Sequence, residues 1–361
     1  MRLLLKSESY YMRHILKLLL LGCALCATSA CHQTPSNQGN VSASNCQTVQ
    51  HEVGETQVCD RPQRIVALNP KMLDILLSLD VQPVGYAEVF PIHRGEFDRP
   101  SQQIPYLGNR ITQPIANLGA SSEPSLEAIA RLKPDLILGD SGQNKDEYAQ
   151  LSQIAPTLLF EYVGHDKWQE PLSAIAQVLG RERQAQAVIE THRQQVEATR
   201  QAIAPIVKAY PEVLMLASEQ LTQSLELVTS ADFCGGLLED VGFQLVSRSN
   251  EQPTSIVQSI SVEVLPQLDA NLIFIQGHDV TSFSQMGSVK NLENNQLQKI
   301  QRSWRSNTIA QSLSASQANR VYFIPTYICR AIPSPTGAQL ALKQLQAQLV
   351  SLSMLVNRSP T

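Results

Sequence analysis

Two stretches of the sequence carry the same order of polar and apolar positions, 136 residues apart. Ser125 to Gly139 reads SLEAIARLKPDLILG, and Ser261 to Ile275 reads SVEVLPQLDANLIFI. Each has a serine in a helix N-cap position, a carboxylate two residues later, apolar residues at helical spacing, a polar break and an apolar run. The pattern predicts helix, turn and strand, twice. It favours two related α/β lobes over a solenoid of shorter repeats, although chance convergence of two helix-strand units is an alternative.

The other apolar runs alternate between lengths typical of strands and of helices. Strands are expected at residues 64–68, 83–86, 157–160, 212–217, 225–228, 243–246 and 320–324, and helices at 72–79, 235–241 and 337–355. This alternation predicts mostly parallel sheets covered by helices. Residues 88–120 look like a long loop and are therefore a candidate for function. Residues 276–310 are polar, and no element is predicted for most of them.

A long helix is predicted between the two lobes. Residues 181–203 contain no proline or glycine, and Ile189, Val196 and Ile203 fall seven residues apart on one stripe. Such a helix would be about 35 Å long and could act as a rigid strut. A peripheral coiled-coil arm is the alternative, but few apolar residues are available for its seam.

The first 31 residues have the pattern of a targeting segment. Arg13 and Lys17 precede the apolar run Leu18 to Ala27, which is too short to span a bilayer and suits a signal peptide. Small residues then lead to Cys31, as at a bacterial lipoprotein cleavage site. We expect Cys31 to be lipidated, with simple secretion as the alternative. The polar residues 32–45 that follow are expected to form a flexible tether.

Composition and charge narrow the range of partners. The chain has 361 residues, of which 43% are hydrophobic and 17% charged, as in a soluble protein with more than one domain. Beyond residue 31, 24 basic and 31 acidic residues remain. The excess of acidic residues argues against nucleic acid as a partner. Because only 5% of residues are aromatic, each aromatic residue near a predicted site carries weight.

Four cysteines remain after the targeting segment, as expected in an oxidising compartment. Cys46 and Cys59 flank a polar stretch around Gly54 that could turn one short strand back on another, so a disulfide is favoured there over a metal site. Cys234 and Cys329 are then the second pair. Four cysteines allow three pairings, and the sequence does not choose between them.

Motifs of catalysis are missing from the sequence. It contains no GxSxG, P-loop, GxGxxG or HExxH pattern, and no nucleophile stands with a base. No resident cofactor or metal is predicted. A tethered two-lobe protein of this kind is expected to bind rather than catalyse, in a cleft between its lobes.

The order of the sequence blocks resembles the periplasmic solute-binding proteins of ABC importers for ferric siderophores, vitamin B12 and haem. The blocks are RIVALNPKMLDILLSLDVQPVGY, EPSLEAIARLKPDLILG, LSQIAPTLLF, CGGLLEDVGFQLV, SVEVLPQLDANLIFI and NRVYFIPTYICRAIPSP. The opening CQTVQHEVGETQVCDRPQRIVAL is most similar to the ferric-siderophore branch. The resemblance implies two doubly wound α/β lobes joined by one long helix, with a shallow cleft and little hinge motion. The implied divisions are a signal peptide (1–31), tether and hairpin (32–60), N-terminal lobe (61–170), linking region (171–208) and C-terminal lobe (209–357).

The resemblance assigns permease docking to one surface glutamate from each lobe. By motif these are Glu127 and Glu263, the matching carboxylates of the repeated stretches. Glu123 is the rival in the first lobe. The alternative is that both carboxylates merely complement helix dipoles, an effect of about 0.3 to 1 kcal/mol each.

A cleft for a ferric chelate needs aromatic faces for the organic shell and arginine for its charge. The candidates are Tyr86, Phe90, Arg94, Arg110, Phe283, Trp304, Tyr327 and Arg330. For each, the alternative is a solvated arginine or an aromatic residue that packs beneath its loop. Many siderophore binders carry an arginine just before the EPxLE motif, where this chain has Ser121 and Ser122. We therefore expect Arg94 or Arg110 to take over the contact with the anion.

Together these features predict a monomeric, periplasmic, lipid-anchored protein that binds a ferric siderophore and delivers it to an ABC permease. Iron would be present only within the bound chelate. Vitamin B12 or haem is the nearest alternative ligand, with His93 or Tyr327 as an axial ligand of haem iron. Two further hypotheses are an α/β enzyme and a sensor that has lost transport.

Overall fold

The computed structural model describes residues 45–90, 93–161, 164–247, 255–277, 279, 289 and 292–356. The described residues from Asn45 onward form one compact unit. Three predicted features lie outside the described residues: the signal peptide, lipidation at Cys31 and the ligand candidate Phe283.

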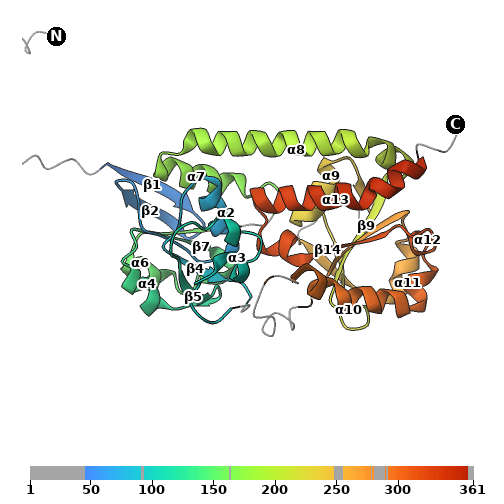
Figure 1. Cartoon of the computed structure of the whole chain (residues 1–361), viewed down its shortest axis with the longest axis horizontal. Coiled ribbons are helices and arrows are strands. Elements are labelled where there is room, and N and C mark those ends of the chain that lie inside the picture. The colour runs from blue at the N-terminus through green and yellow to red at the C-terminus, as the bar shows by residue number, and fades with distance from the viewer. Residues whose placement is uncertain are drawn as a thin grey trace, which may run out of the picture. The chain divides into compact units, whose positions relative to one another are not determined.

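The N-terminal lobe is a six-stranded sheet covered by helices (Figure 1). Its order is β6-β5-β4-β3-β7-β8, and all neighbours are parallel except β5 and β6. The strands are β3 (Ile65–Ala67), β4 (Gly85–Glu88), β5 (Ala116–Ala120), β6 (Glu123–Pro124), β7 (Leu136–Asp140) and β8 (Thr157–Phe160). The helices are α2 (Pro70–Ser78), α3 (Pro100–Gln103), η1 (Gly108–Arg110), α4 (Leu126–Leu132), α5 (Ser141–Asn144), α6 (Tyr148–Ile154) and α7 (Gln169–Leu179).

The C-terminal lobe has a second six-stranded sheet, in which parallel and antiparallel pairs are mixed. Its order is β12-β10-β9-β13-β14, with β11 beside β9, and β10 is antiparallel to both neighbours. The strands are β9 (Glu212–Ser218), β10 (Leu225–Val228), β11 (Gln244–Leu245), β12 (Val257–Ile260), β13 (Leu272–Gly277) and β14 (Val321–Pro325). The helices are α9 (Phe233–Asp240), η2 (Val262–Gln267), α10 (Leu292–Ser306), α11 (Thr308–Ser312), α12 (Ser314–Gln317), η5 (Tyr327–Ala331) and α13 (Pro335–Val356).

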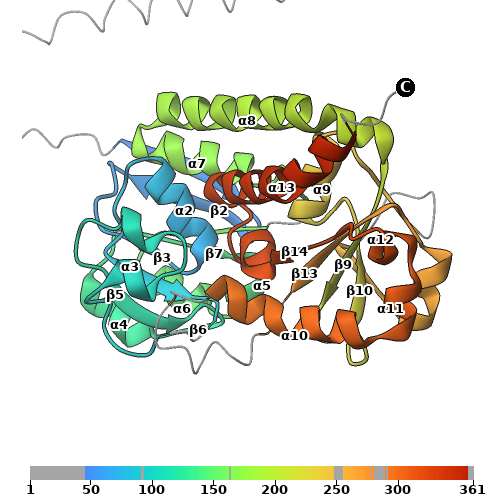
Figure 2. The same cartoon turned by 45° about the vertical axis from the view of Figure 1, so that its right-hand side comes forward.

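One long helix, α8 (Glu182–Ala209), joins the lobes along one side, as Figures 1 and 2 show. Its 28 residues correspond to about 42 Å. The helix is longer than predicted because it continues through Pro205, with Ile203 and Ile206 buried on either side of the proline. Helix α13 packs along α8, and Gln346 donates a hydrogen bond to Thr199 at 2.7 Å. The strut prediction is confirmed, and a free coiled-coil arm is excluded.

The repeated stretches occupy equivalent places in the two sheets. In the first, the Ser125 hydroxyl accepts a hydrogen bond from the Ala128 amide at 3.2 Å and caps α4, which leads to β7. In the second, η2 is a 3₁₀-helix before β13. Pro266 lies inside η2, and proline in an α-helix lacks the donor N–H and clashes with the preceding turn. The proline thus accounts for the different type of the second helix, while the strand that follows keeps the equivalent place in its sheet.

Several elements are not predicted by the sequence pattern. The predicted loop 88–120 contains α3, η1 and the strand β5, so that prediction is wrong for these parts. Strand β5 reads ANLGA and is only partly buried, which leaves no apolar run to detect. Helices α7 and α10 were not predicted either. In α10, polar residues surround buried Leu292, Ile300 and Trp304.

Two disulfides are present among the described residues. Cys46 pairs with Cys59 and closes the antiparallel hairpin of β1 (Cys46–His51) and β2 (Gly54–Cys59). Cys234 of α9 pairs with Cys329 of η5. Of the three possible pairings, the structure therefore has the one in which a disulfide closes the expected hairpin. Across the described part of the chain, no helix is long and apolar enough to cross a membrane.

Candidate functional site

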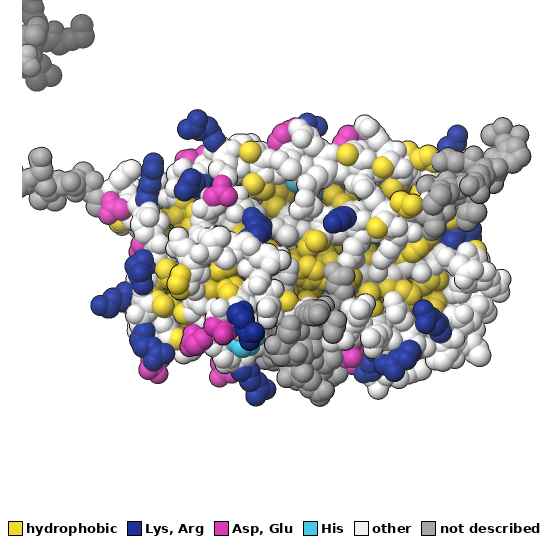
Figure 3. Space-filling view, viewed as in Figure 1, with side chains coloured by type: hydrophobic (Ala, Val, Ile, Leu, Met, Phe, Trp, Pro, Cys, Tyr) yellow, Lys and Arg dark blue, Asp and Glu magenta, His cyan; other side chains and the backbone are white. Residues whose placement is uncertain are grey.

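A cavity of about 590 Å³ lies in the N-terminal lobe where strands β4 and β5 end. The carboxyl ends of parallel strands are the usual place for ligands in open α/β sheets. Its polar lining includes Glu88, His93, Arg94, Asn117, Glu123 and Arg131. In Figure 3, charged side chains of both signs and a histidine gather on the lower edge of this lobe.

The loop beside the cavity is held by side-chain contacts. The Asn117 amide donates to the Gly95 carbonyl at 2.6 Å. Nε2 of His93 lies 2.8 Å from the Glu96 carbonyl oxygen and 3.1 Å from Nε2 of Gln103. The exposed side chain of Arg94 is therefore carried by an anchored loop, which restricts the positions that its guanidinium can reach.

The floor of the cavity is Glu88, the last residue of β4. Tyr86 lies two residues earlier on the same face, and its hydroxyl donates to Oε2 of Glu88 at 2.7 Å. The hydroxyl of Tyr327, from the C-terminal lobe, lies 2.9 Å from both carboxylate oxygens. The Val89 amide donates to Oε1 at 2.7 Å. Glu88 thus accepts hydrogen bonds from residues of both lobes and links the lobes to each other.

Burial sets the electrostatics of this cluster. Tyr86 and Tyr327 are fully buried, and Glu88 is 5% exposed. Loss of hydration raises the pKa of Glu88 to about 7, although its hydrogen bonds favour the charged form. Burial, and then the charge of Glu88, raise the pKa of both tyrosines well above the usual range. Both phenols therefore stay protonated at neutral pH and serve as donors.

Aromatic rings surround Tyr327 at the junction of the lobes. Its ring centroid lies 5.9 Å from that of Phe90 and 5.7 Å from that of Tyr106. The structure thus brings together three of the predicted ligand residues, Tyr86, Phe90 and Tyr327. Only Phe90 is partly exposed. The positions of the two tyrosines favour a packing role, with the hydroxyl of Tyr327 engaged by Glu88 rather than facing a ligand.

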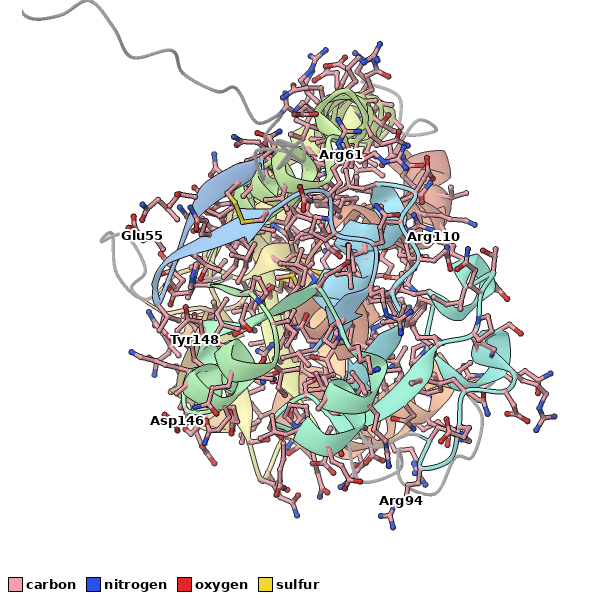
Figure 4. All side chains as sticks on the ribbon, turned by 90° about the vertical axis from the view of Figure 1, so that its left-hand side faces the viewer. Glu55, Arg61, Arg94, Arg110, Asp146 and Tyr148 are labelled. Carbon is pink, nitrogen blue, oxygen red and sulfur yellow. A yellow bond between two sulfur atoms is a disulfide. The ribbon has the colours of Figure 1, made fainter. Side chains whose placement is uncertain are left out.

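The two loop arginines lie in different surroundings. Arg94 lines the cavity, whereas Arg110 lies elsewhere on the lobe (Figure 4). Arg110 forms an ion pair with the buried Asp74 at 2.9 Å and donates to the Thr336 hydroxyl at 2.8 Å. Asp74 also accepts from Ser334 at 2.7 Å. Of the two arginines proposed for the anion, only Arg94 is placed to contact a ligand in the cavity.

Two candidates of the C-terminal lobe are engaged within that lobe. Arg330 lies 3.1 Å from Oε2 of Glu226 and 3.7 Å from Oδ2 of Asp232. Trp304 is 3% exposed, packs in the core beneath α11 and α12, and donates to the Ser316 hydroxyl at 3.1 Å. Trp304 is therefore placed as a core residue, and Arg330 as a partner in partly buried ion pairs.

The predicted docking glutamates both lie on the surface in the first turn of a helix. Glu127 forms an ion pair with Arg131 at 3.1 Å, and its side chain is 82% exposed. Glu263 is the second residue of η2, and a hydrogen bond from Ser261 lowers its pKa, so it stays ionised at neutral pH. The rival Glu123 is also exposed, but it lines the cavity.

Sequence reasoning missed Glu88, Asn117 and Arg131. Glu88 was assigned to the start of a loop, because its strand was predicted to end at Tyr86. The alternation of Tyr86 and Glu88 was the available signal, since side chains two apart in a strand share a face. Asn117 lies in the unpredicted strand β5. Arg131 lies one turn after Glu127, a spacing that predicts an ion pair rather than a cavity wall.

The fold and the cavity together define a class. Two α/β sheets joined by a single long helix, with a polar cavity at the strand ends, are the architecture of a two-lobe solute-binding protein. Residues 65–328 match the family described as periplasmic binding protein, and the chain belongs to that family.

Curated relatives and solved structures extend the comparison. The chain is 26% identical to the Fe(3+)-citrate-binding protein YfmC of Bacillus subtilis, over 85% of this chain and 87% of that protein. It is 36% identical to the Fe(3+) dicitrate-binding periplasmic protein FecB of Escherichia coli, over 41% and 47%. Its fold is similar to that of Staphylococcus aureus SirA complexed with staphyloferrin B, with a TM-score of 0.66, 22% identity and coverage of 84% and 98%.

Proposed function

We propose that the protein is the extracytoplasmic substrate-binding component of an ABC importer for ferric siderophores. It binds the iron chelate and delivers it to the permease, without catalysing a reaction. The observation that carries this proposal is the cavity at the ends of β4 and β5, with Arg94 and Arg131 in its wall beside the junction of the lobes. Relatives named for Fe(3+)-citrate support the ligand class.

Two arginines in the cavity wall suit an anionic chelate, although Glu88, Glu96 and Glu123 line the same cavity. Guanidinium groups form paired hydrogen bonds with carboxylates, and Arg94 and Arg131 supply two of them. Phe90 adds an aromatic face at the same junction. A citrate-type ferric chelate is therefore the first ligand to test. Haem is less favoured, because Tyr327 is buried against Glu88 and His93 Nε2 contacts its own loop.

Intrinsic fluorescence of the purified protein tests this function. We expect quenching by a ferric chelate of the citrate, catecholate or hydroxamate type, and none by cobalamin or haem. Saturable quenching by cobalamin or haem alone would reassign the ligand. No response to any ferric chelate would contradict the proposal.

Delivery requires a permease and a location outside the cytoplasm. We propose that Glu127 and Glu263 form salt bridges with the permease, one from each lobe, and that Cys31 carries a lipid anchor to the membrane. The exposure of both carboxylates supports the first assignment, and relatives named as lipoproteins support the second. If Cys31 is the anchor, Cys31→Ser should move the protein from the membrane fraction to the soluble fraction.

A further inference from the structure

A histidine and two aspartates meet outside the cavity at the ends of β4 and β5. His165 and Asp166 lie between β8 and α7, whereas Asp240 is the last residue of α9 in the C-terminal lobe. Nε2 of His165 is 3.3 Å from Oδ2 of Asp166 and 3.3 Å from Oδ2 of Asp240. One candidate ligand atom from each side chain lies within 4.8 Å of the other two.

We propose that His165, Asp166 and Asp240 bind a divalent transition-metal ion that links the two lobes. Zinc binds imidazole nitrogen and carboxylate oxygen at about 2.0 to 2.2 Å, so neighbouring ligands of a tetrahedral ion are about 3.3 to 3.6 Å apart. Nε2 of His165 already has nearly this spacing to each carboxylate. The Asp166 side chain is 59% exposed, so water can reach the fourth position.

The side chains around His165 suit a cation. The carboxylates of Asp166 and Asp240 both lie beside Nε2 of His165, where a metal ion would take the place of the proton. Arg200 reaches the same end of α9, but it donates to the backbone oxygen of Asp240 at 2.8 Å and leaves the carboxylate available.

Packing fixes the orientation of the imidazole ring. A Cβ atom on Gly236 would lie 2.2 Å from Cγ of His165, so only glycine lets the ring rest on α9. Asp240 follows Gly236 by four residues and therefore lies on the same helix face. The ring is thus held against the helix that carries one of the proposed ligands, as metal-binding histidines are commonly oriented by their surroundings.

A second imidazole borders the cluster. His192 of α8 is 6% exposed, and its Nδ1 has no hydrogen-bond partner among the described residues. Its ring packs edge-on against Trp168 with centroids 5.1 Å apart. The ring is therefore fixed in place beside the cluster.

Metal titration of the tag-free protein tests the proposal. After treatment with EDTA, the protein is titrated with Zn²⁺ by calorimetry and with Co²⁺ by visible absorption. We expect one ion per chain, a tetrahedral Co²⁺ spectrum and a higher Tm with Zn²⁺. His165→Gln and Asp166→Asn should each weaken Zn²⁺ binding at least about tenfold. His51→Gln, a change of a part-buried histidine in the hairpin, should leave it unchanged.

Asp166→Asn keeps the test decisive if His165→Gln does not fold, because Asp166 is mostly exposed. Unchanged Zn²⁺ affinity in folded Asp166→Asn would overturn the proposal. So would absence of Zn²⁺ binding by the unaltered protein, even if His165→Gln lowered the Tm, since His165 would then be only a hydrogen-bonded contact between lobes. The titration contains no ferric chelate, so its result is independent of the proposed transport function.

Discussion

At the scale of single residues, we expect Arg94 to serve ligand binding and Arg110 to serve stability. Arg94 is exposed in the cavity, whereas Arg110 compensates the buried charge of Asp74. We predict that Arg94→Ala weakens binding of the ferric chelate about tenfold or more, the loss of one charge-assisted contact, with little change in Tm. Arg110→Ala should cost about 2 kcal/mol of stability, less than a fully buried pair because Arg110 is partly exposed.

Chelate titration and urea unfolding of both variants check this contrast. Arg110→Lys serves as the control that keeps the charge. Equal losses of affinity in Arg94→Ala and Arg110→Ala would contradict the separation.

Glu88 should make stability depend on pH. Its pKa is raised from 4.5 to about 7 in the folded protein, so the folded state binds the proton more tightly than the unfolded state does. The resulting contribution to the free energy of unfolding is complete below about pH 4.5 and is lost as the pH rises to about 7. The free energy of unfolding therefore falls by about 3 kcal/mol over this range. Glu88→Gln, which resembles the protonated form, should remove this dependence.

Urea unfolding between pH 5 and 8 measures the effect of Glu88. The exposed Glu212 at the start of β9 offers a control, since Glu212→Gln should keep the slope of the unaltered protein. If Glu88→Gln loses stability with pH in parallel with the unaltered protein, the carboxyl of Glu88 is not the group responsible.

At the scale of elements, the first turns of α4 and η2 carry the proposed docking carboxylates. We predict that Glu127→Arg and Glu263→Arg each abolish chelate uptake in cells, and that Glu263→Arg leaves chelate affinity of the purified protein unchanged. The reason is that both side chains are exposed and lie outside the cavity lining. Glu182→Arg, in the first turn of α8, is the matched control and should transport normally. Loss of chelate affinity together with uptake would indicate a structural role instead.

The two disulfides should differ in their contribution to stability. Cys234 and Cys329 are 95 residues apart and buried, whereas Cys46 and Cys59 are 13 apart. Closing a longer loop restricts the unfolded chain more. The expected contribution to the free energy of unfolding is about 4 to 5 kcal/mol for the longer loop and about 3 kcal/mol for the shorter one. Replacing each pair by serine and comparing urea midpoints checks the order. A larger loss from the hairpin pair would show that native contacts, rather than loop length, dominate.

Sequence patterns predicted strands whose residues are mostly buried. Strands β8 and β10 begin and end at the predicted residues. TLLF of β8 is buried along its whole length, and in LELV of β10 only Glu226 is partly exposed. Strand β5 and helix α10 depend on contacts distant in sequence, and no local pattern reveals them.

The candidate site was likewise predicted only in part. Arg94 could be selected by residue type, but the pairing of Glu88 with Tyr327 joins residues 239 apart and exists only once both lobes have folded.

At the scale of the whole molecule, the lobes are joined by more than the linking helix. Tyr327 binds Glu88 in the cavity floor, Thr336 and Ser334 bind Asp74, and α13 packs along α8. A continuous core of buried residues includes side chains of both sheets. Wide opening of the lobes would break these buried hydrogen bonds, each costly to leave unsatisfied.

We therefore predict that the chelate-free and chelate-saturated proteins differ in radius of gyration by less than about 1 Å, as in pre-organised complexes. Small-angle scattering measures this difference. Tyr327→Phe removes one hydroxyl from the junction without changing the ring, and it should leave the radius unchanged because the Asp74 contacts and α13 remain. A contraction of several ångströms on binding would instead show that these contacts open and close with each cycle, and that α8 bends with them.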